Sequence, residues 1–187
     1  MTTKFILHGG FTPGKTDEDN DDFYAEILKD APEEPEILIV PFAKEPGRIE
    51  ASTQKVMEEF TANKWQKWIY FNVAREESFI EQLRLADIVY FQGGKTLKLL
   101  EALKKFPTLK EMLQGKIVAG ESAGANVLTS AFYSPSAGSS FEGLAFLPIK
   151  LIPHYTQEYE GKLDNLKPDL ETLLLRVYEH KVIEVDL

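Results

Sequence analysis

A serine flanked by glycines is the residue of this chain best suited to chemistry. Residues 120–124 read Gly-Glu-Ser-Ala-Gly, and Lys116–Ala119 before them read as a short buried strand. This is the G-x-S-x-G pattern, in which a serine occupies a cramped turn between a strand and a helix. The turn exposes the serine oxygen and directs the first N–H groups of the helix to the same space, where they suit an oxyanion. The pattern predicts a nucleophile at Ser122; the alternative is a glycine-rich turn with an incidental serine.

A serine nucleophile needs a base, and the chain offers three histidines. A serine hydroxyl is a poor nucleophile at neutral pH until a base takes its proton and a third group orients that base. The candidates are His8, His154 and His180. We expect His8 to line a crevice or pack at a strand end, and His180 to be solvated in a hairpin turn.

Strand and helix patterns alternate along the chain. Short apolar runs predict strands at 5–7, 37–40, 68–71, 88–91 and 117–119. Helical spacing of apolar residues predicts helices with the faces Phe23, Tyr24, Ile27 and Leu28; Val56, Met57 and Phe60; and Leu97, Leu100 and Leu103. Alternation of this kind predicts an open, mostly parallel, doubly wound α/β sheet. Later segments, 141–154 and 173–185, predict strands that form an antiparallel C-terminal extension, with 135–140 as a loop.

Three glycine-bearing turns come directly after predicted parallel strands. They lie at residues 8–10, 93–94 and 120–122. In an open α/β sheet the binding crevice lies outside the carboxyl ends of the strands. The three turns therefore predict a functional site at that edge of the sheet.

Three motifs together resemble the S51 serine peptidases, the family of dipeptidase E and cyanophycinase. They are Ser-Ala-Gly-Ala-Asn at 122–126, Pro-His-Tyr at 153–155, and a strand followed by Gly-Gly-Lys-Thr at 93–96. Lys95 stands where the family usually has asparagine. The resemblance implies a flavodoxin-like fold of the class I glutamine amidotransferase type, in a single domain over residues 1–187. Those amidotransferases use a cysteine nucleophile, and this chain contains no cysteine.

The resemblance also implies roles for individual residues. It makes Ser122 the nucleophile of an acyl-enzyme mechanism on small peptides, including aspartyl or other acidic and β-linked substrates. His154 matches the family's Pro-His-aromatic position and becomes the base. The oxyanion hole would use the backbone N–H of Ala123 with that of Gly94 or Gly93.

Substrate-binding residues are predicted less specifically. Glu121, beside the nucleophile, could bind a free amino group of the substrate or face solvent. His8 and Lys95 are further candidates, and Lys150 is another basic candidate for acidic substrates.

The acid that would orient His154 is the weakest assignment. Dipeptidase E places an aspartate between the serine and the histidine, but residues 127–141 contain no Asp or Glu. Cyanophycinase places a glutamate after the histidine, and residues 177–182 resemble that turn. We therefore expect Glu179 to be the acid, with Glu142 second and a solvated Glu179 as the alternative.

Other function classes compete with this interpretation. Gly9–Thr16 matches the P-loop pattern of nucleotide-binding proteins, but five carboxylates follow at 17–22, where they would repel phosphate. No later strand ends in the aspartate needed to hold Mg²⁺. An α/β-hydrolase esterase shares G-x-S-x-G, but little chain follows Ser122 for its remaining strands. A catalytically inactive, ligand-binding member of the same fold is the last alternative.

Composition narrows the partners. The chain carries 21 basic and 30 acidic residues, a net charge of −9, and no basic stripe, so nucleic acid is not expected. The longest apolar run, 37–43, is far too short to cross a membrane. The N-terminus shows no signal-peptide pattern and the cysteine content is zero, which predicts a cytoplasmic protein. We expect a small peptide substrate, no cofactor or metal, and leave a homodimer open.

Overall fold

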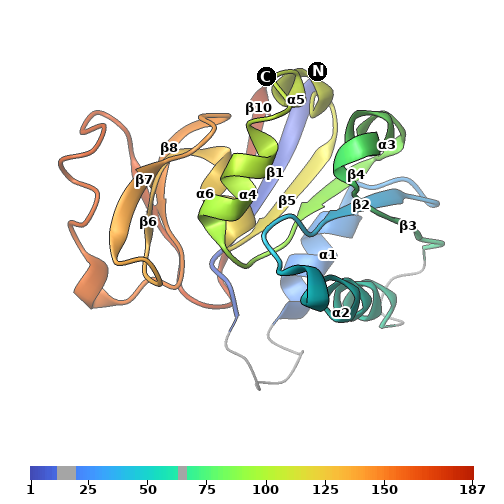
Figure 1. Ribbon diagram of the computed structural model, residues 1–187, viewed down its shortest axis with the longest axis horizontal. Helices are drawn as coiled ribbons and strands as arrows, with labels where there is room; N and C mark the ends of the chain where they lie inside the picture. Colours follow the sequence, from blue (N-terminus) through green and yellow to red (C-terminus); the bar gives the residue numbers. More distant parts are fainter. Residues whose placement is uncertain (12–19, 63–66) are drawn as a thin grey trace.

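A six-stranded sheet forms the centre of the molecule, with a smaller sheet beside it (Figure 1). The computed structural model describes residues 1–11, 20–62 and 67–187. The strand order of the larger sheet is β10-β1-β5-β4-β2-β3. Its strands are β1 Thr2–His8, β2 Glu36–Val40, β3 Tyr70–Val73, β4 Ile88–Phe91, β5 Ile117–Glu121 and β10 His180–Asp186. The neighbouring strands β1, β5, β4, β2 and β3 pair in parallel, which confirms the predicted mostly parallel sheet. β10 pairs antiparallel with β1, as predicted for the C-terminal edge, whereas residues 147–152 of the predicted antiparallel extension form a parallel strand of the smaller sheet.

Both faces of this sheet are buried by helices. The inner strands β5, β4 and β2 are almost wholly apolar, and their alternate residues join two separate hydrophobic clusters, as a doubly wound fold requires. One cluster packs against α1 (Asp21–Lys29) and α2 (Ile49–Thr61). The other packs against α3 (Phe79–Leu85), α4 (Thr96–Leu103), α5 (Leu109–Met112) and α6 (Ala123–Leu128). Short 3-10 turns lie at η2 Pro46–Arg48, η3 Glu76–Ser78 and η4 Gln157–Tyr159.

The smaller sheet has the order β7-β6-β8-β9. Its strands are β6 Thr129–Ser134, β7 Ser139–Glu142, β8 Leu147–Ile152 and β9 Thr172–Leu174. β8 pairs in parallel with β6 and β9, and β7 pairs antiparallel with β6. The sequence does not predict β6, because its Thr-Ser-Ala-Phe-Tyr-Ser run shows no alternation; all six residues are buried.

Several local predictions need correction. β3 begins at Tyr70, two residues later than expected, and Trp68 is 77 % exposed. The apolar face predicted for α4 includes Leu97, but Leu97 is 47 % exposed. Leu99 is the leucine of α4 that is fully buried instead. His180 is half-buried at the start of β10, not solvated in a turn. Among the described residues, no helix is long and apolar enough to cross a membrane.

The carboxyl ends of the parallel strands meet at one edge. In register, His8 at the end of β1 pairs with Glu121 at the end of β5. Phe91 at the end of β4 pairs with Gly120 and with Val40, the last residue of β2. The turns after these strands therefore lie side by side, and this edge holds the site.

Candidate active site

The turn at Ser122 has the strained geometry of a nucleophile elbow. Ser122 adopts φ 47° and ψ −96°, which L-residues rarely occupy. A Cβ at Gly120 would lie 2.6 Å from backbone atoms of α6, and one at Gly124 would lie 2.1 Å from the Phe91 carbonyl oxygen. The Ser122 N–H donates to the His8 carbonyl at 2.9 Å, which ties the elbow to β1. Both glycines are therefore needed for the close approach of strand and helix.

His154 is the histidine that reaches the serine. Its Nε2 lies 2.9 Å from the Ser122 Oγ. The His154 backbone has φ 49°, and its N–H donates to the Gly9 carbonyl at 2.8 Å. Gly10, at φ 98°, packs against the imidazole: a Cβ there would lie 2.2 Å from Cε1. Burial lowers the pKa of His154, so the ring is neutral over a wider pH range and able to accept a proton.

The structure does not bring either expected acid to His154. The Glu179 Oε2 accepts a hydrogen bond from the Arg176 backbone N–H at 2.8 Å, and the Arg176 guanidinium lies 3.7 Å from Oε1. Glu142 is exposed and pairs with Lys167 at 3.4 Å. In residues 1–11, 20–62 and 67–187, neither carboxylate contacts the ring, and the pKa of His154 is shifted by burial alone.

Two backbone N–H groups lie near the serine without partners. Among the described residues, the N–H groups of Gly94 and Ala123 form no hydrogen bond. Ala123 directly follows the nucleophile. Gly94 has φ 145°, and a Cβ there would lie 2.6 Å from the Ala43 carbonyl oxygen, so only glycine fits. The Lys95 N–H donates to the same carbonyl at 2.9 Å and fixes this loop.

Glu121 is buried beside the serine. The carboxylate is shielded from solvent, and the Tyr90 hydroxyl donates to its Oε2 at 3.0 Å. The Gly93 backbone N–H also interacts with the carboxylate. Burial raises the pKa of Glu121, and Lys44 leads the groups that oppose this shift.

The remaining predicted substrate residues lie elsewhere. His8 is buried, its ring stacks on Phe23 at 4.4 Å, and its Nδ1 accepts from the Gly10 N–H at 3.1 Å. Burial, with smaller effects of the other two histidines, lowers the pKa of His8 to about 3. Lys95 is exposed and pairs with Glu45 at 2.8 Å. Lys150 is buried and donates to a backbone carbonyl, so it is not open to a substrate.

A cavity of about 410 Å³, the candidate catalytic cavity, contains Ser122 and His154. It is lined by Phe11, Lys44, Gly93, Gly94, Thr96, Glu121, Ser122, Asn126, Ser134, Pro135, Ser136, Pro153 and His154. No role was predicted for Lys44 or Asn126. Lys44 follows β2, so the rule that sites lie beyond strand ends could have found it. Asn126 lies inside the motif at 122–126, but an asparagine at this position does not by itself indicate a functional role.

The P-loop alternative falls partly outside the described residues, which do not include 12–16. At its described start, the Gly9 N–H donates to the Glu179 carbonyl at 2.8 Å and the Gly10 N–H donates to His8. These donors hold the protein together, so they are not free to cradle phosphate.

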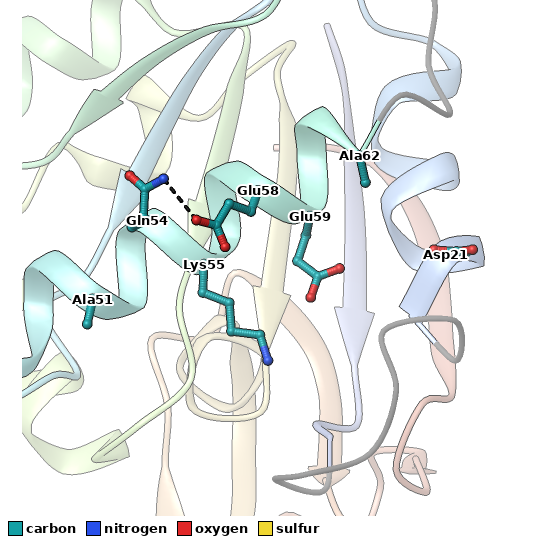
Figure 2. Close-up of a pocket in the computed structure, with 7 residues that line it drawn as sticks. All are labelled: Asp21, Ala51, Gln54, Lys55, Glu58, Glu59 and Ala62. Carbon is teal, nitrogen blue, oxygen red and sulfur yellow. Dashed lines mark hydrogen bonds between the residues drawn. The ribbon is translucent and has the colours of Figure 1, made fainter.

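Two further hollows adjoin α2. One, of about 730 Å³, shares Lys44 and Gly94 with the catalytic cavity and is also lined by Arg48, Lys55 and Lys95. The other, of about 550 Å³, is lined mainly by one side of α2, where Gln54 hydrogen-bonds to Glu58 (Figure 2). The described residues that line it include no serine or histidine, so they offer no comparable nucleophile and base.

Known proteins resemble this chain in sequence and in fold. The model of peptidase family S51 matches residues 5–186. A Drosophila melanogaster protein named "Probable alpha-aspartyl dipeptidase" is 29 % identical over 136 residues, which cover 67 % of this chain and 54 % of that protein. The match thus spans about half of that relative's length.

Two solved structures share the fold. One is "a Putative Peptidase E Protein from Listeria monocytogenes EGD-e", with a TM-score of 0.63, 18 % identity and full coverage of both chains. The other is "a peptidase from an acI-B1 Actinobacterium", with a TM-score of 0.66, 20 % identity and coverage of 100 % of this chain and 85 % of that one.

Proposed function

Because this chain belongs to peptidase family S51, we propose that it hydrolyses short peptides through an acyl-enzyme formed on Ser122. The observation that carries the proposal is the 2.9 Å contact between the Ser122 Oγ and the His154 Nε2. It places a neutral base within hydrogen-bond reach of a nucleophile held on a strained turn.

The reaction follows from these positions. His154 takes the Ser122 proton as the Oγ attacks the scissile carbonyl, and negative charge develops on the carbonyl oxygen. The N–H groups of Ala123 and Gly94 stabilise that charge; Gly93 is the weaker donor candidate because its N–H interacts with Glu121. The imidazolium then protonates the leaving amine, and the C–N bond breaks. Water, activated by the same ring, releases the acyl group and restores the serine.

His154 works here without a carboxylate partner among the described residues. Backbone contacts replace part of its function: Gly9 fixes the His154 main chain, and Gly10 packs on the ring. A Ser–His pair of this kind loses the stabilisation that an acid gives to the imidazolium, so turnover is expected to be modest.

Acidic peptides are the substrates that the surroundings favour. Lys44 borders the catalytic cavity, and Arg48 and Lys55 line the adjoining hollow, so positive charge gathers beside the oxyanion loop. On a chain of net charge −9 such a gathering suits a carboxylate of the substrate. The name of the Drosophila relative points the same way, to α-aspartyl dipeptides.

Labelling with a fluorophosphonate probe tests the mechanism. Ser122 is expected to react, and Ser122→Ala should lose both labelling and hydrolysis of aspartyl dipeptides while keeping its melting temperature. Ser136→Ala, at the rim of the same cavity, is the matched control and should label normally. An unlabelled wild-type protein that still binds dipeptides would instead support the non-catalytic alternative.

A further inference from the structure

The Glu121 carboxylate is a buried acid that faces the catalytic cavity. It ends β5, directly before the nucleophile, and it is 8 % exposed. Its contacts are two neutral donors, the Tyr90 hydroxyl and the Gly93 N–H. A buried carboxylate is costly when no positive charge compensates it. The negative charge of the Glu121 carboxylate therefore lacks a cationic partner in direct contact among the described residues.

The protein's own cations act on this carboxylate only from a distance. Lys44 and Lys55 stabilise its charged form through space. Within residues 1–11, 20–62 and 67–187, no ammonium or guanidinium lies within 4.0 Å of its oxygens. Glu121 also lines the cavity that contains Ser122 and His154, which is where a substrate would enter.

The contacts of Glu121 also fix where its charge lies. A Cβ at Gly93 would lie 2.5 Å from the Glu121 Oε1, so the carboxylate packs directly against the loop that carries the Gly94 N–H. Tyr90 is fully buried and holds the other oxygen. An uncompensated negative charge here opposes the growth of an oxyanion a short distance away. A cation that arrives with the substrate removes this opposition.

Standard bond lengths indicate which cationic group of a bound peptide can lie close to Glu121. The carbonyl carbon under attack sits roughly 3 Å from the Ser122 Oγ in a reactive complex. The α-nitrogen of the same residue is about 2.5 Å from that carbon, given standard bond lengths and angles. An N-terminal ammonium on this residue therefore falls close to Ser122, and among the described residues that line the cavity Glu121 is the acidic one.

We propose that Glu121 binds the free α-ammonium of the residue whose carbonyl Ser122 attacks, so that the enzyme requires an unblocked N-terminus and releases the first residue of a peptide. The inference rests on the proposed serine mechanism. A blocked substrate places a neutral amide at this position and leaves the buried carboxylate unpaired. Glu121 thus selects for the positive charge of the substrate's α-ammonium. This selection is separate from any selection of the substrate's acidic side chain by the lysines.

Three matched substrates test this role. They are L-aspartyl p-nitroanilide, its N-acetyl form, and the succinyl analogue that lacks the amine. Truncating one partner of a buried charge pair is strongly unfavourable, so the wild type should prefer the free amine by about 100-fold or more in kcat/KM. Glu121→Gln should lose about 100-fold on the free amine while its rates on the other two stay unchanged or rise. Glu184→Gln, exposed on β10, is the matched control and should keep the wild-type preference.

Fluorophosphonate labelling separates this inference from the proposed mechanism. Glu121→Gln should still label at Ser122, and aspartyl-alanine should protect only the wild type, whereas N-acetyl-aspartyl-alanine should protect neither. Equal rates on free and blocked substrates, or an equal loss on all three in Glu121→Gln, would overturn the ammonium site and leave the serine mechanism standing. Failure of Ser122 to label in either protein would instead contradict the mechanism.

Discussion

Ser122 and His154, the proposed catalytic pair, are held by different kinds of structure. Ser122 lies at the centre of the parallel sheet, on a turn whose glycines are pressed between β4 and α6. His154 comes after β8 of the smaller sheet and reaches the serine from outside the main sheet. The serine is thus held by the packed strands and helix of the main sheet, and the histidine by a turn that reaches it from the smaller sheet.

The end of β1 joins the two regions. The His8 carbonyl accepts the Ser122 N–H, and the Gly9 carbonyl accepts the His154 N–H. Gly10 then supports the imidazole. Substitutions of the elbow glycines should therefore destabilise the fold, whereas substitutions beside His154 should mainly displace its ring.

Gly124→Ala should produce the largest effect. Its new Cβ would lie 2.1 Å from the Phe91 backbone oxygen, in a fully packed region where neither strand nor helix can yield. We expect a loss of about 3 kcal/mol or more in the free energy of unfolding, measured by chemical denaturation. Gly47→Ala, which meets nothing within 4 Å, is the control and should stay near wild type. A stable Gly124→Ala protein would contradict the claim that the serine turn is held by rigid backbone packing.

Gly10→Ala should damage turnover more than stability. The added methyl meets the His154 ring, which can rotate away where a packed backbone cannot, so the cost to folding is mainly the strain of a non-glycine residue at φ 98°, about 1–2 kcal/mol. Displacing the base costs much of its contribution, so kcat should fall about 100-fold, while the midpoint of unfolding changes far less than in Gly124→Ala. Equal damage to folding and turnover would show that both sides are held alike.

Acidification should weaken the junction itself through His8. In the folded state its pKa is about 3, because burial disfavours the charged ring, against about 6.5 when unfolded. The unfolded chain therefore binds a proton first, and stability falls as the pH drops from about 6.5 towards 3. Between pH 7 and pH 5 this amounts to about 2 kcal/mol. Denaturant titrations of wild type and His8→Gln should show a shallower pH slope in the variant; parallel slopes would contradict the buried neutral ring.

The same division explains how far the sequence predicts the site. Local spacing encodes the elbow at 120–124, and apolar runs encode five parallel strands, so the amino-acid sequence alone predicts the serine and the sheet edge. It does not predict β6, because burial of Thr129–Ser134 on all sides leaves no periodic pattern. The sequence places Gly10 in a turn, but the contact of Gly10 with His154 joins residues far apart in the chain, which spacing cannot reveal.

Glu179→Gln should have the smallest effect, although the family resemblance makes Glu179 the acid. In the structure its carboxylate caps the Arg176 N–H, a contact that the amide oxygen of glutamine can keep. We therefore expect kcat/KM on aspartyl dipeptides to change by less than about threefold. Glu142→Gln should change kcat/KM equally little. An acid that held His154 would behave differently: the corresponding change in a serine protease costs about 10⁴ in turnover. A loss of 100-fold or more in Glu179→Gln alone would mean that this turn swings onto His154 when substrate binds. The histidine side would then be completed only in the complex, while the serine side is already complete in the free protein.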